Sequence, residues 1–254
     1  METGSVVTNT RSNTFNAATA FLISLALSTI YLLFRNWLAG EWIRLEPGWT
    51  SIGRAWVLHL GALVILGGVP FLLRTKGGFT ARLRPRWDGR DTTATGAGSC
   101  TGERFRAVLA AFPLWFKIAA PLVAMGIAIW SSADPGLRST YPIPEATPWN
   151  VVRYLAFMPS YLVYYVAFEF HYRGFLLPTL RESMNPWAAL LLQSIPSTLI
   201  HIGLCRTELL GSLPGQLAFG WIALRGGSFW PAVLLHVITG ITLDISILLN
   251  GGVL

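Results

Sequence analysis

Long apolar stretches alternate with short polar ones along most of the chain, as in proteins that cross a membrane several times. A helix needs about 20 consecutive apolar residues to span the hydrocarbon core of a bilayer. Seven apolar segments come near this length and cover residues 15–38, 52–73, 108–130, 151–180, 186–204, 209–224 and 229–249. The pattern therefore predicts an all-α fold, a polytopic transmembrane helical bundle with about seven spans.

Two of these segments differ from an ordinary single span. Residues 15–38 are too long for the core of a signal peptide and no small-residue cleavage site follows them, so we expect a retained span. Residues 151–180 are too long for one untilted span, and Pro159 offers a kink or a break within them. Eight spans are expected if Pro159 separates two elements.

The composition excludes an ordinary soluble domain, because 53% of the 254 residues are hydrophobic, only 12% are charged and 11 are Trp. The net charge is +7, and the loop at residues 74–106 holds eight basic residues against three acids. By the positive-inside rule this loop and the N-terminus are cytoplasmic, in a multi-pass protein of the cell membrane. The lipid bilayer, and not a nucleic acid, is the expected partner of these charges.

The chain is predicted to have three parts. Residues 1–14 form a polar tail, residues 15–148 hold the N-terminal membrane helices with their basic loop, and residues 149–254 form the core that carries the candidate chemistry. Cys100 and Cys205 show neither a CxxC pattern nor metal-type spacing, so we expect two free thiols.

Ionisable side chains stand inside the fourth apolar segment, in the stretch FEFHYRGFLLP that begins at Phe168. Such groups cost several kcal/mol at the bilayer centre unless they are paired or face water. Glu169 and Arg173 are four residues apart, so on a helix they share a face and partly neutralise each other. His171 points to a different side. A further histidine, His59 in the second segment, is expected to be structural and bonded to a neighbouring helix.

Three separate apolar segments each present a histidine or a carboxylate in the last hundred residues. Glu169 lies on the fourth segment, His201 on the fifth, and His236 and Asp244 on the seventh. Any one of them could be a structural contact between helices. Taken together, several costly groups in one half of the chain indicate one shared site.

The spacing of these residues refines the prediction. On a continuous helix His201 and Glu208 would lie two turns apart, about 10 Å, on one face without touching. His236, Gly240 and Asp244 follow at intervals of four and also share a face.

A carboxylate and two imidazoles suit the activation of a water molecule, with the carboxylate as general base and the imidazoles holding the water or stabilising an oxyanion. Glu169, His201 and His236 could equally hold a zinc ion or another divalent metal with one open position. The sequence contains no HExxH, which excludes a zincin site.

The same residues resemble the motifs of the CPBP intramembrane proteases, also called the Abi or type II CAAX prenyl endopeptidase family. That family has EExxxRG on one helix, FxxxH on the next and HxxxN on a later one. Residues 150–250 carry the resemblance, through Phe168, Glu169, Arg173 and Gly174, then Ser197 and His201, then His236 and Gly240.

The chain departs from the family pattern at two positions. Phe168 stands where the family has its first glutamate, the main base, and Gly240 stands where it has an asparagine that stabilises the oxyanion. The chain is similar to a branch with a lone glutamate in the first motif, and in that branch acids stand at the positions of Glu208 and Asp244. These two acids are the candidates to replace the missing groups.

The resemblance implies an intramembrane endopeptidase that hydrolyses peptide bonds of membrane-associated proteins or peptides. Glu169, His201 and His236 would be catalytic or bind metal, supported by Arg173, Glu208, Asp244, His171 and Gly240.

Two other functions stay open. Phe168 and Gly240 fit a catalytically silent scaffold, immunity factor or partner-binding protein with the same fold. A transporter that uses Glu169 and Asp244 to carry protons fits less well, because no inverted repeats are visible.

Overall fold

The computed structural model describes residues 10–41, 49–76, 110–142 and 149–251, and every regular element among them is a helix. Five helical stretches are long and apolar enough to cross a membrane: Ala17–Leu38, Ser51–Leu73, Leu114–Ser131, Val151–Arg181 and Trp230–Asn250. The predicted polytopic helical bundle is confirmed, and the protein is a multi-pass membrane protein. The basic loop falls mostly outside the described residues, so the orientation of the N-terminus stays a prediction.

The number of spans differs from the seven predicted, because the fifth and sixth apolar segments do not qualify. Helix α9 (Pro186–Leu199) has 14 residues, which makes it about 21 Å long, well short of a bilayer core of about 30 Å. Helix α10 (Arg206–Gly226) has 21 residues, but glycines and Gln216 interrupt its apolar sequence. The apolar segments correctly predicted two helices here, but the prediction that both helices span the membrane was wrong.

The fourth segment is one continuous helical rod, which makes the eight-span alternative wrong. Helix α7 (Val151–Glu169) passes through Pro159 without a break. A π-helical turn, η2 (Phe170–Leu176), follows it and leads into α8 (Leu177–Arg181). The irregularity therefore lies at the FEFHYRG sequence and not at the proline. Single π-helical turns often mark functional sites.

Gly174 allows this π-helical turn to pack closely. A Cβ atom at this position would lie 2.9 Å from the Phe170 ring and 3.3 Å from the Phe229 ring. Residues 171–180 are all buried, so the turn is enclosed on every side. A rigid, enclosed turn holds Glu169 and Arg173 in fixed positions.

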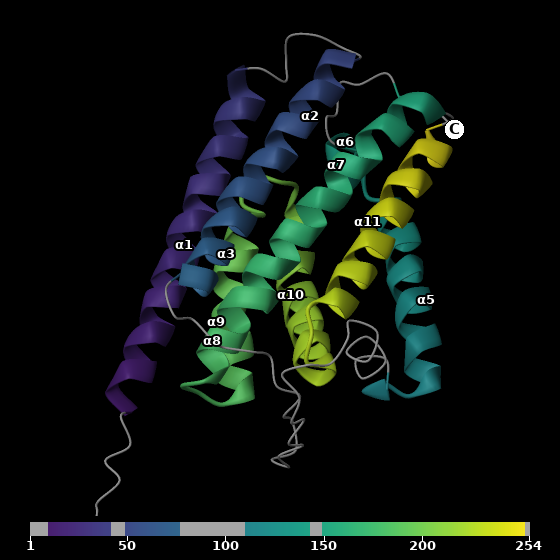
Figure 1. Cartoon of the computed structure of the whole chain (residues 1–254). Helices are drawn as coiled ribbons and strands as arrows, with labels where there is room; N and C mark the ends of the chain where they lie inside the picture. Colours follow the sequence, from purple (N-terminus) through teal and green to yellow (C-terminus); the bar gives the residue numbers. More distant parts are fainter. Residues whose placement is uncertain (1–9, 42–48, 77–109, 143–148, 252–254) are drawn as a thin grey trace, which may run out of the picture.

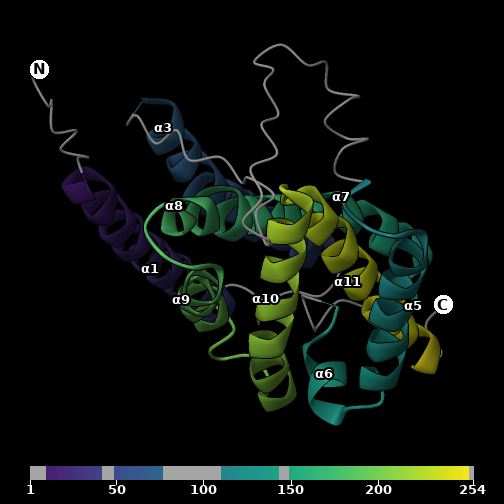
Figure 2. The same cartoon turned by 90° about the horizontal axis from the view of Figure 1, so that it is seen from below.

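Helix α7 has neighbouring helices on two sides (Figures 1 and 2). On one side of α7 lie α2 and η1, and on the other side lies α11, which also packs along α5. Helix α1 packs against α8 and α9, and α9 packs against α10. Their bounds are Thr10–Glu41 for α1, Trp49–Ala62 for α2, Leu63–Gly68 for η1, Val69–Lys76 for α3, Leu114–Ser131 for α5, Pro135–Thr140 for α6 and Trp230–Asn250 for α11. Helix α1 begins inside the stretch predicted to be a polar tail.

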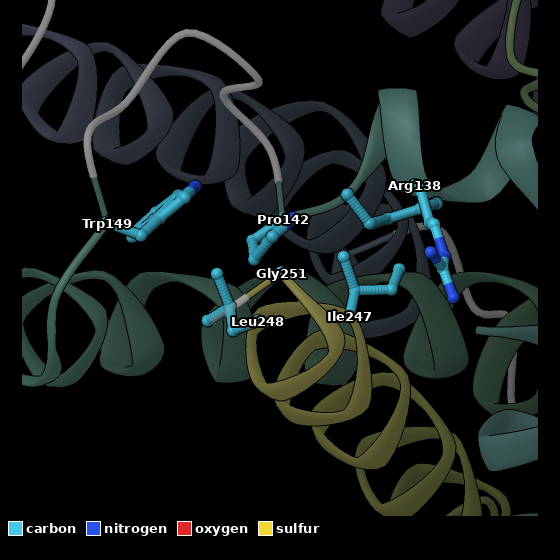
Figure 3. A pocket seen from close by; sticks show the side chains of 7 residues that line it. Arg138, Pro142, Trp149, Ile247, Leu248 and Gly251 are labelled. Carbon is cyan, nitrogen blue, oxygen red and sulfur yellow. The ribbon is translucent and has the colours of Figure 1, made fainter. Parts of the chain in front are cut away.

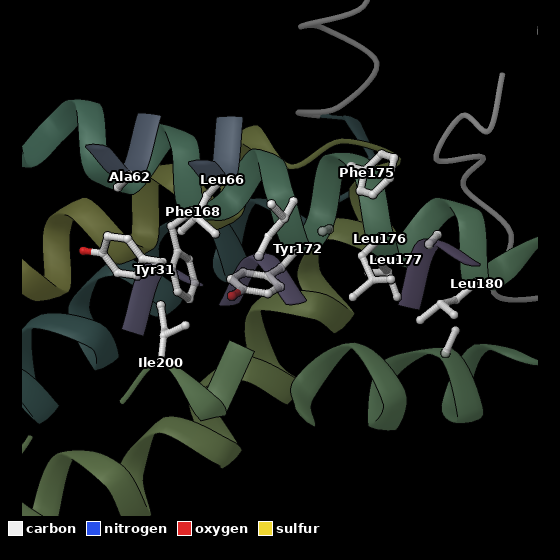
Figure 4. Packing of buried hydrophobic residues seen from close by; sticks show 14 of the residues in the cluster. Tyr31, Ala62, Leu66, Phe168, Tyr172, Phe175, Leu176, Leu177, Leu180 and Ile200 are labelled. Atoms are coloured by element: carbon white, nitrogen blue, oxygen red, sulfur yellow. The ribbon is translucent and has the colours of Figure 1, made fainter. Parts of the chain in front are cut away.

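The largest hydrophobic cluster lies where α1 and η1 meet the end of α7 and the turn η2 (Figure 4). Phe168 and Tyr172 are fully buried there, beside Leu66 of η1. A second cluster joins α2 to α7. His59 of α2 packs against its Phe157 ring, and the His59 Nδ1 lies 2.9 Å from the Ser160 hydroxyl. The His59 ring also stacks on Tyr161, so its predicted structural role is confirmed.

Candidate active site

The site is built where α7 and α11 run antiparallel and side by side (Figure 1). Glu169 of α7 faces His236 of α11. One turn away, Tyr165 of α7 faces Gly240 of α11. The four-residue spacing on both helices therefore sets two matched pairs of residues opposite each other.

Glu169 is the centre of this arrangement and is completely buried. Its Oε1 lies 2.7 Å from Nδ1 of His236, and its Oε2 lies 3.2 Å from Nη1 of Arg173. This buried carboxylate therefore has a guanidinium and an imidazole as its two polar partners. The predicted pairing of Glu169 with Arg173 is present in the structure.

Arg173 is itself fixed by a second partner. Its Nη2 donates to the backbone carbonyl of Gln216 at 3.1 Å and also to the Gln216 side-chain oxygen. The guanidinium carbon lies 5.5 Å from the centre of the Phe168 ring. Helix α10 thus supplies the polar contacts that a buried guanidinium requires.

The hydrogen bond to Glu169 determines the tautomer of His236. An ionised carboxylate only accepts hydrogen bonds, so Nδ1 carries the proton and Nε2 of the neutral ring carries a lone pair. The rings of Tyr165, Phe168 and Phe219 pack around this imidazole. The His236 side chain is 18% exposed, so it is not sealed inside the bundle, as a base that must meet water requires.

His201 lies in a turn and not on a helix. The expectation of one helix carrying His201 and Glu208 is wrong, because α9 ends at Leu199 and α10 begins at Arg206. Gly203 makes the turn with φ +89°, a conformation that suits glycine. Nε2 of His201 and Oε1 of Glu208 are therefore only 3.8 Å apart.

Arg35 of α1 holds this turn in place by donating to the backbone carbonyls of Ile200 and Ile202. Nδ1 of His201 lies 3.0 Å from the Ser197 carbonyl oxygen. A carbonyl oxygen can only accept, so Nδ1 donates and Nε2 faces Glu208 with its lone pair. The two histidines of the site thus adopt the same tautomer.

Glu208 stands in the first turn of α10, outside the five spans. Burial raises the pKa of its carboxyl to about 7, against the opposite effect of a hydrogen bond from Tyr141. The Tyr141 hydroxyl donates to Oε1 at 2.6 Å. This carboxyl accordingly titrates near neutral pH beside His201.

Phe168 packs against both histidines. Its ring meets the His236 ring edge-on at 5.3 Å between centres and the His201 ring at 6.2 Å. Where the resembling family places its first glutamate, this chain therefore has an apolar side chain in contact with both imidazoles.

The other predicted residues lie in two places. Asp244 is completely buried two turns beyond His236, and its Oδ2 lies 3.5 Å from the Tyr154 hydroxyl. His171 packs against Tyr172 and Phe175. Asp244 therefore extends the same face of α11, whereas His171 contacts a different set of residues, as its position in the sequence predicted.

The part of the chain that carries these residues is similar to a known protein family. Residues 148–242 match the family described as type II CAAX prenyl endopeptidase Rce1-like. This stretch of the chain is therefore similar to that family. The match covers α7, α9, α10 and the first half of α11, and so contains Glu169, His201 and His236. No curated protein and no solved structure matches the chain.

The positions of the donor atoms decide whether a metal ion fits between Glu169, His201 and His236. Among the residues that the structure describes, no group of three or more His, Cys, Asp or Glu side chains is placed to hold a metal ion. Oε1 of Glu169 is occupied by His236, and Oε2 faces Arg173. The three predicted ligands therefore do not form a metal site in this arrangement, and zinc stays a prediction from the sequence alone.

Three residues that contribute to the candidate site were not predicted from the sequence. Gln216 holds Arg173, Arg35 holds the turn of His201, and Tyr165 packs on His236 with a ring separation of 4.6 Å. Gln216 could have been found, because a glutamine inside an apolar helix needs a polar partner. Tyr165 gave no such signal in a helix rich in tyrosine.

A hollow of about 230 Å³ lies at the opposite end of α11 from His236 (Figure 3). It is lined by Arg138, Tyr141, Pro142, Trp149, Ile247, Leu248 and Gly251. Ile247 is 11 residues from His236 along α11, about 16 Å at 1.5 Å per residue. The hollow is therefore separate from the Glu169–His236 pair.

Proposed function

We propose that the protein is an intramembrane endopeptidase that hydrolyses peptide bonds of membrane-associated substrates. The observation that carries this proposal is the buried Glu169 carboxylate, 2.7 Å from Nδ1 of a partly exposed His236. The similarity of residues 148–242 to the type II CAAX prenyl endopeptidase family supports the same reaction.

His236 is the general base of the proposed reaction. Its Nε2 takes a proton from a water molecule, whose oxygen attacks the peptide carbonyl carbon. The imidazolium then returns the proton to the leaving nitrogen as the C–N bond breaks. Glu169 stays ionised and acts as a positioning residue, because it fixes the tautomer of His236 and stabilises the imidazolium.

The remaining predicted site residues support this pair. Arg173 neutralises Glu169 within the apolar interior. His201 and Glu208 form a second pair across the Phe168 ring, and we assign them contact with the substrate and no proton transfer. The substrate is a peptide at the membrane, and a prenylated peptide is the first to test because the matched family is described as prenyl endopeptidases.

A catalytically silent scaffold is the second candidate, and Phe168 favours it. The Phe168 ring is fully buried in contact with both imidazoles. A site that had lost catalysis would tolerate an apolar side chain there. The scaffold would keep the fold and bind a partner without cleaving it.

The deciding experiment is cleavage of a membrane-peptide library, prenylated and unprenylated, by the purified protein in lipid. The test variant is His236→Gln, whose amide N–H can still donate to Glu169 but which has no basic nitrogen. The matched control is His59→Gln, another buried histidine, on α2 and hydrogen-bonded to Ser160. Thermal unfolding of both variants checks that they are folded.

The proposal expects cleavage by the wild type and the control, and a loss of at least about a thousandfold in His236→Gln. Full activity of a folded His236→Gln would contradict the assignment of the base. No cleavage by the folded wild type of any library member would support the scaffold.

A further inference from the structure

Tyr165 occupies the space beside Gly240. A Cβ atom added to Gly240 would lie 1.7 Å from the Tyr165 hydroxyl oxygen and 2.7 Å from Cζ. These distances are far below any van der Waals contact, so a side chain at position 240 and this hydroxyl exclude each other. Gly240 therefore admits the hydroxyl group to the surface of α11.

The same hydroxyl is held firmly in position. Tyr165 is 2% exposed, and its ring packs on the His236 ring at 4.6 Å and on the Tyr161 ring at 4.4 Å. The Tyr161 hydroxyl is hydrogen-bonded to it. A donor that is ordered before the reaction has no reorganisation cost when charge develops.

The position of the hydroxyl relative to His236 suits an oxyanion. Gly240 is one turn from His236 on α11, about 6 Å along the helix axis. A water hydrogen-bonded to a base and an oxyanion hydrogen-bonded to a donor each need about 2.8 Å. A peptide carbonyl attacked by such a water would lie between these two groups, on this face of α11.

We propose that Tyr165 is a catalytic residue whose hydroxyl donates to the oxyanion formed during peptide hydrolysis. This rests on the proposed function. When the water oxygen attacks, the π electrons of the carbonyl move to its oxygen, and the water proton goes to Nε2 of His236. The Tyr165 O–H donates to that oxygen until the C–N bond breaks and the carbonyl re-forms.

The test uses Tyr165→Phe, which removes the hydroxyl and keeps the ring. The control is Tyr31→Phe, a buried tyrosine of α1 that is 3% exposed and stacks on Tyr164. A swap variant, Tyr165→Leu with Gly240→Asn, replaces the hydroxyl with an amide donor on α11. Each is measured for kcat and KM on the best substrate, and for thermal unfolding.

Tyr165→Phe is expected to lower kcat by about 100-fold to 1000-fold with KM unchanged, because the oxyanion exists only after attack. Tyr31→Phe retains wild-type kcat. The swap variant recovers at least about tenfold over Tyr165→Leu alone.

An unchanged kcat in folded Tyr165→Phe, with an active wild type, would overturn this inference alone. A matching fall in kcat in Tyr31→Phe would also overturn it, because the loss would not be specific to the site. An inactive wild type would contradict the proposed function and this inference with it.

Discussion

The candidate site contains two histidine–glutamate pairs that differ in how the carboxylate is held. Glu169 lies 2.7 Å from His236 and has Arg173 on its other side. Glu208 lies 3.8 Å from His201 and has the neutral hydroxyl of Tyr141 as its donor. Only the first pair combines a direct hydrogen bond with a compensating cation.

This difference indicates which pair can perform proton transfer. A buried carboxylate with no cation in direct contact gains a proton readily, and burial raises the pKa of Glu208 to about 7 against the lowering effects of the Tyr141 hydrogen bond and the Arg35 charge. A neutral carboxyl does little to stabilise an imidazolium. The carboxylate beside His236 has the Arg173 guanidinium as a direct partner, whereas the carboxylate beside His201 has the Tyr141 hydroxyl.

The largest expected effect separates the two carboxylates directly. Glu169→Gln removes the charge that orients His236, and kcat should fall by about 1000-fold to 10,000-fold. Glu208→Gln should lower kcat by less than about tenfold, since its carboxyl is not needed as an anion. Steady-state cleavage by both variants checks this. Equal losses would mean that the two pairs act as one unit.

The next effect concerns stability. Arg173→Met leaves Glu169 buried without its cation and should lower the free energy of unfolding by about 3–5 kcal/mol. The double variant Arg173→Met with Glu169→Leu should recover most of that loss while remaining inactive. Unfolding by denaturant in mild detergent measures both. A stable Arg173→Met protein would show that the ion pair contributes little.

A smaller effect depends on pH and on the second pair. The folded protein keeps Glu208 protonated between pH 4.5, its ordinary pKa, and about 7, whereas the unfolded chain releases that proton. The wild type should therefore lose stability relative to Glu208→Gln as pH rises through this window, by up to about 3 kcal/mol.

Thermal unfolding of the wild type and Glu208→Gln over this pH range makes that comparison. A difference that stays constant with pH would contradict the altered pKa. The same scan on Glu182→Gln, at an exposed glutamate after α8, provides the control.

The smallest expected effect is that of a chelator. The described residues hold no group of three metal donors, and the proposed steps use only His236, Glu169 and Tyr165. Cleavage should be unchanged by EDTA or phenanthroline. Loss of cleavage that zinc restores would show that the two histidines come together around a metal during the reaction.

The sequence predicted much of the fold because hydrophobic length is visible in it. The spans at residues 15–38, 52–73 and 229–249 agree with the structure to within two residues at each end. The predicted span at residues 186–204 was wrong, because an apolar segment shows that a helix is buried but not whether lipid or protein surrounds it. The short α9 packs between α1 and α10.

The candidate site was predictable where two groups follow a helical repeat. Glu169 with Arg173, and His236 with Gly240 and Asp244, keep their intervals of four residues in the structure. The contact of His201 with Glu208 was not predictable, because it depends on a turn at Gly203 held by a distant Arg35. The place of Tyr165 beside Gly240 likewise depends on how two helices are aligned.

A single cleavage assay can compare the two histidines, as His236→Gln and His201→Gln. We expect that His236→Gln loses at least about a thousandfold in kcat and that His201→Gln stays within about tenfold of the wild type. A larger loss in His201→Gln than in His236→Gln would contradict it, and would place the general base on the other side of Phe168.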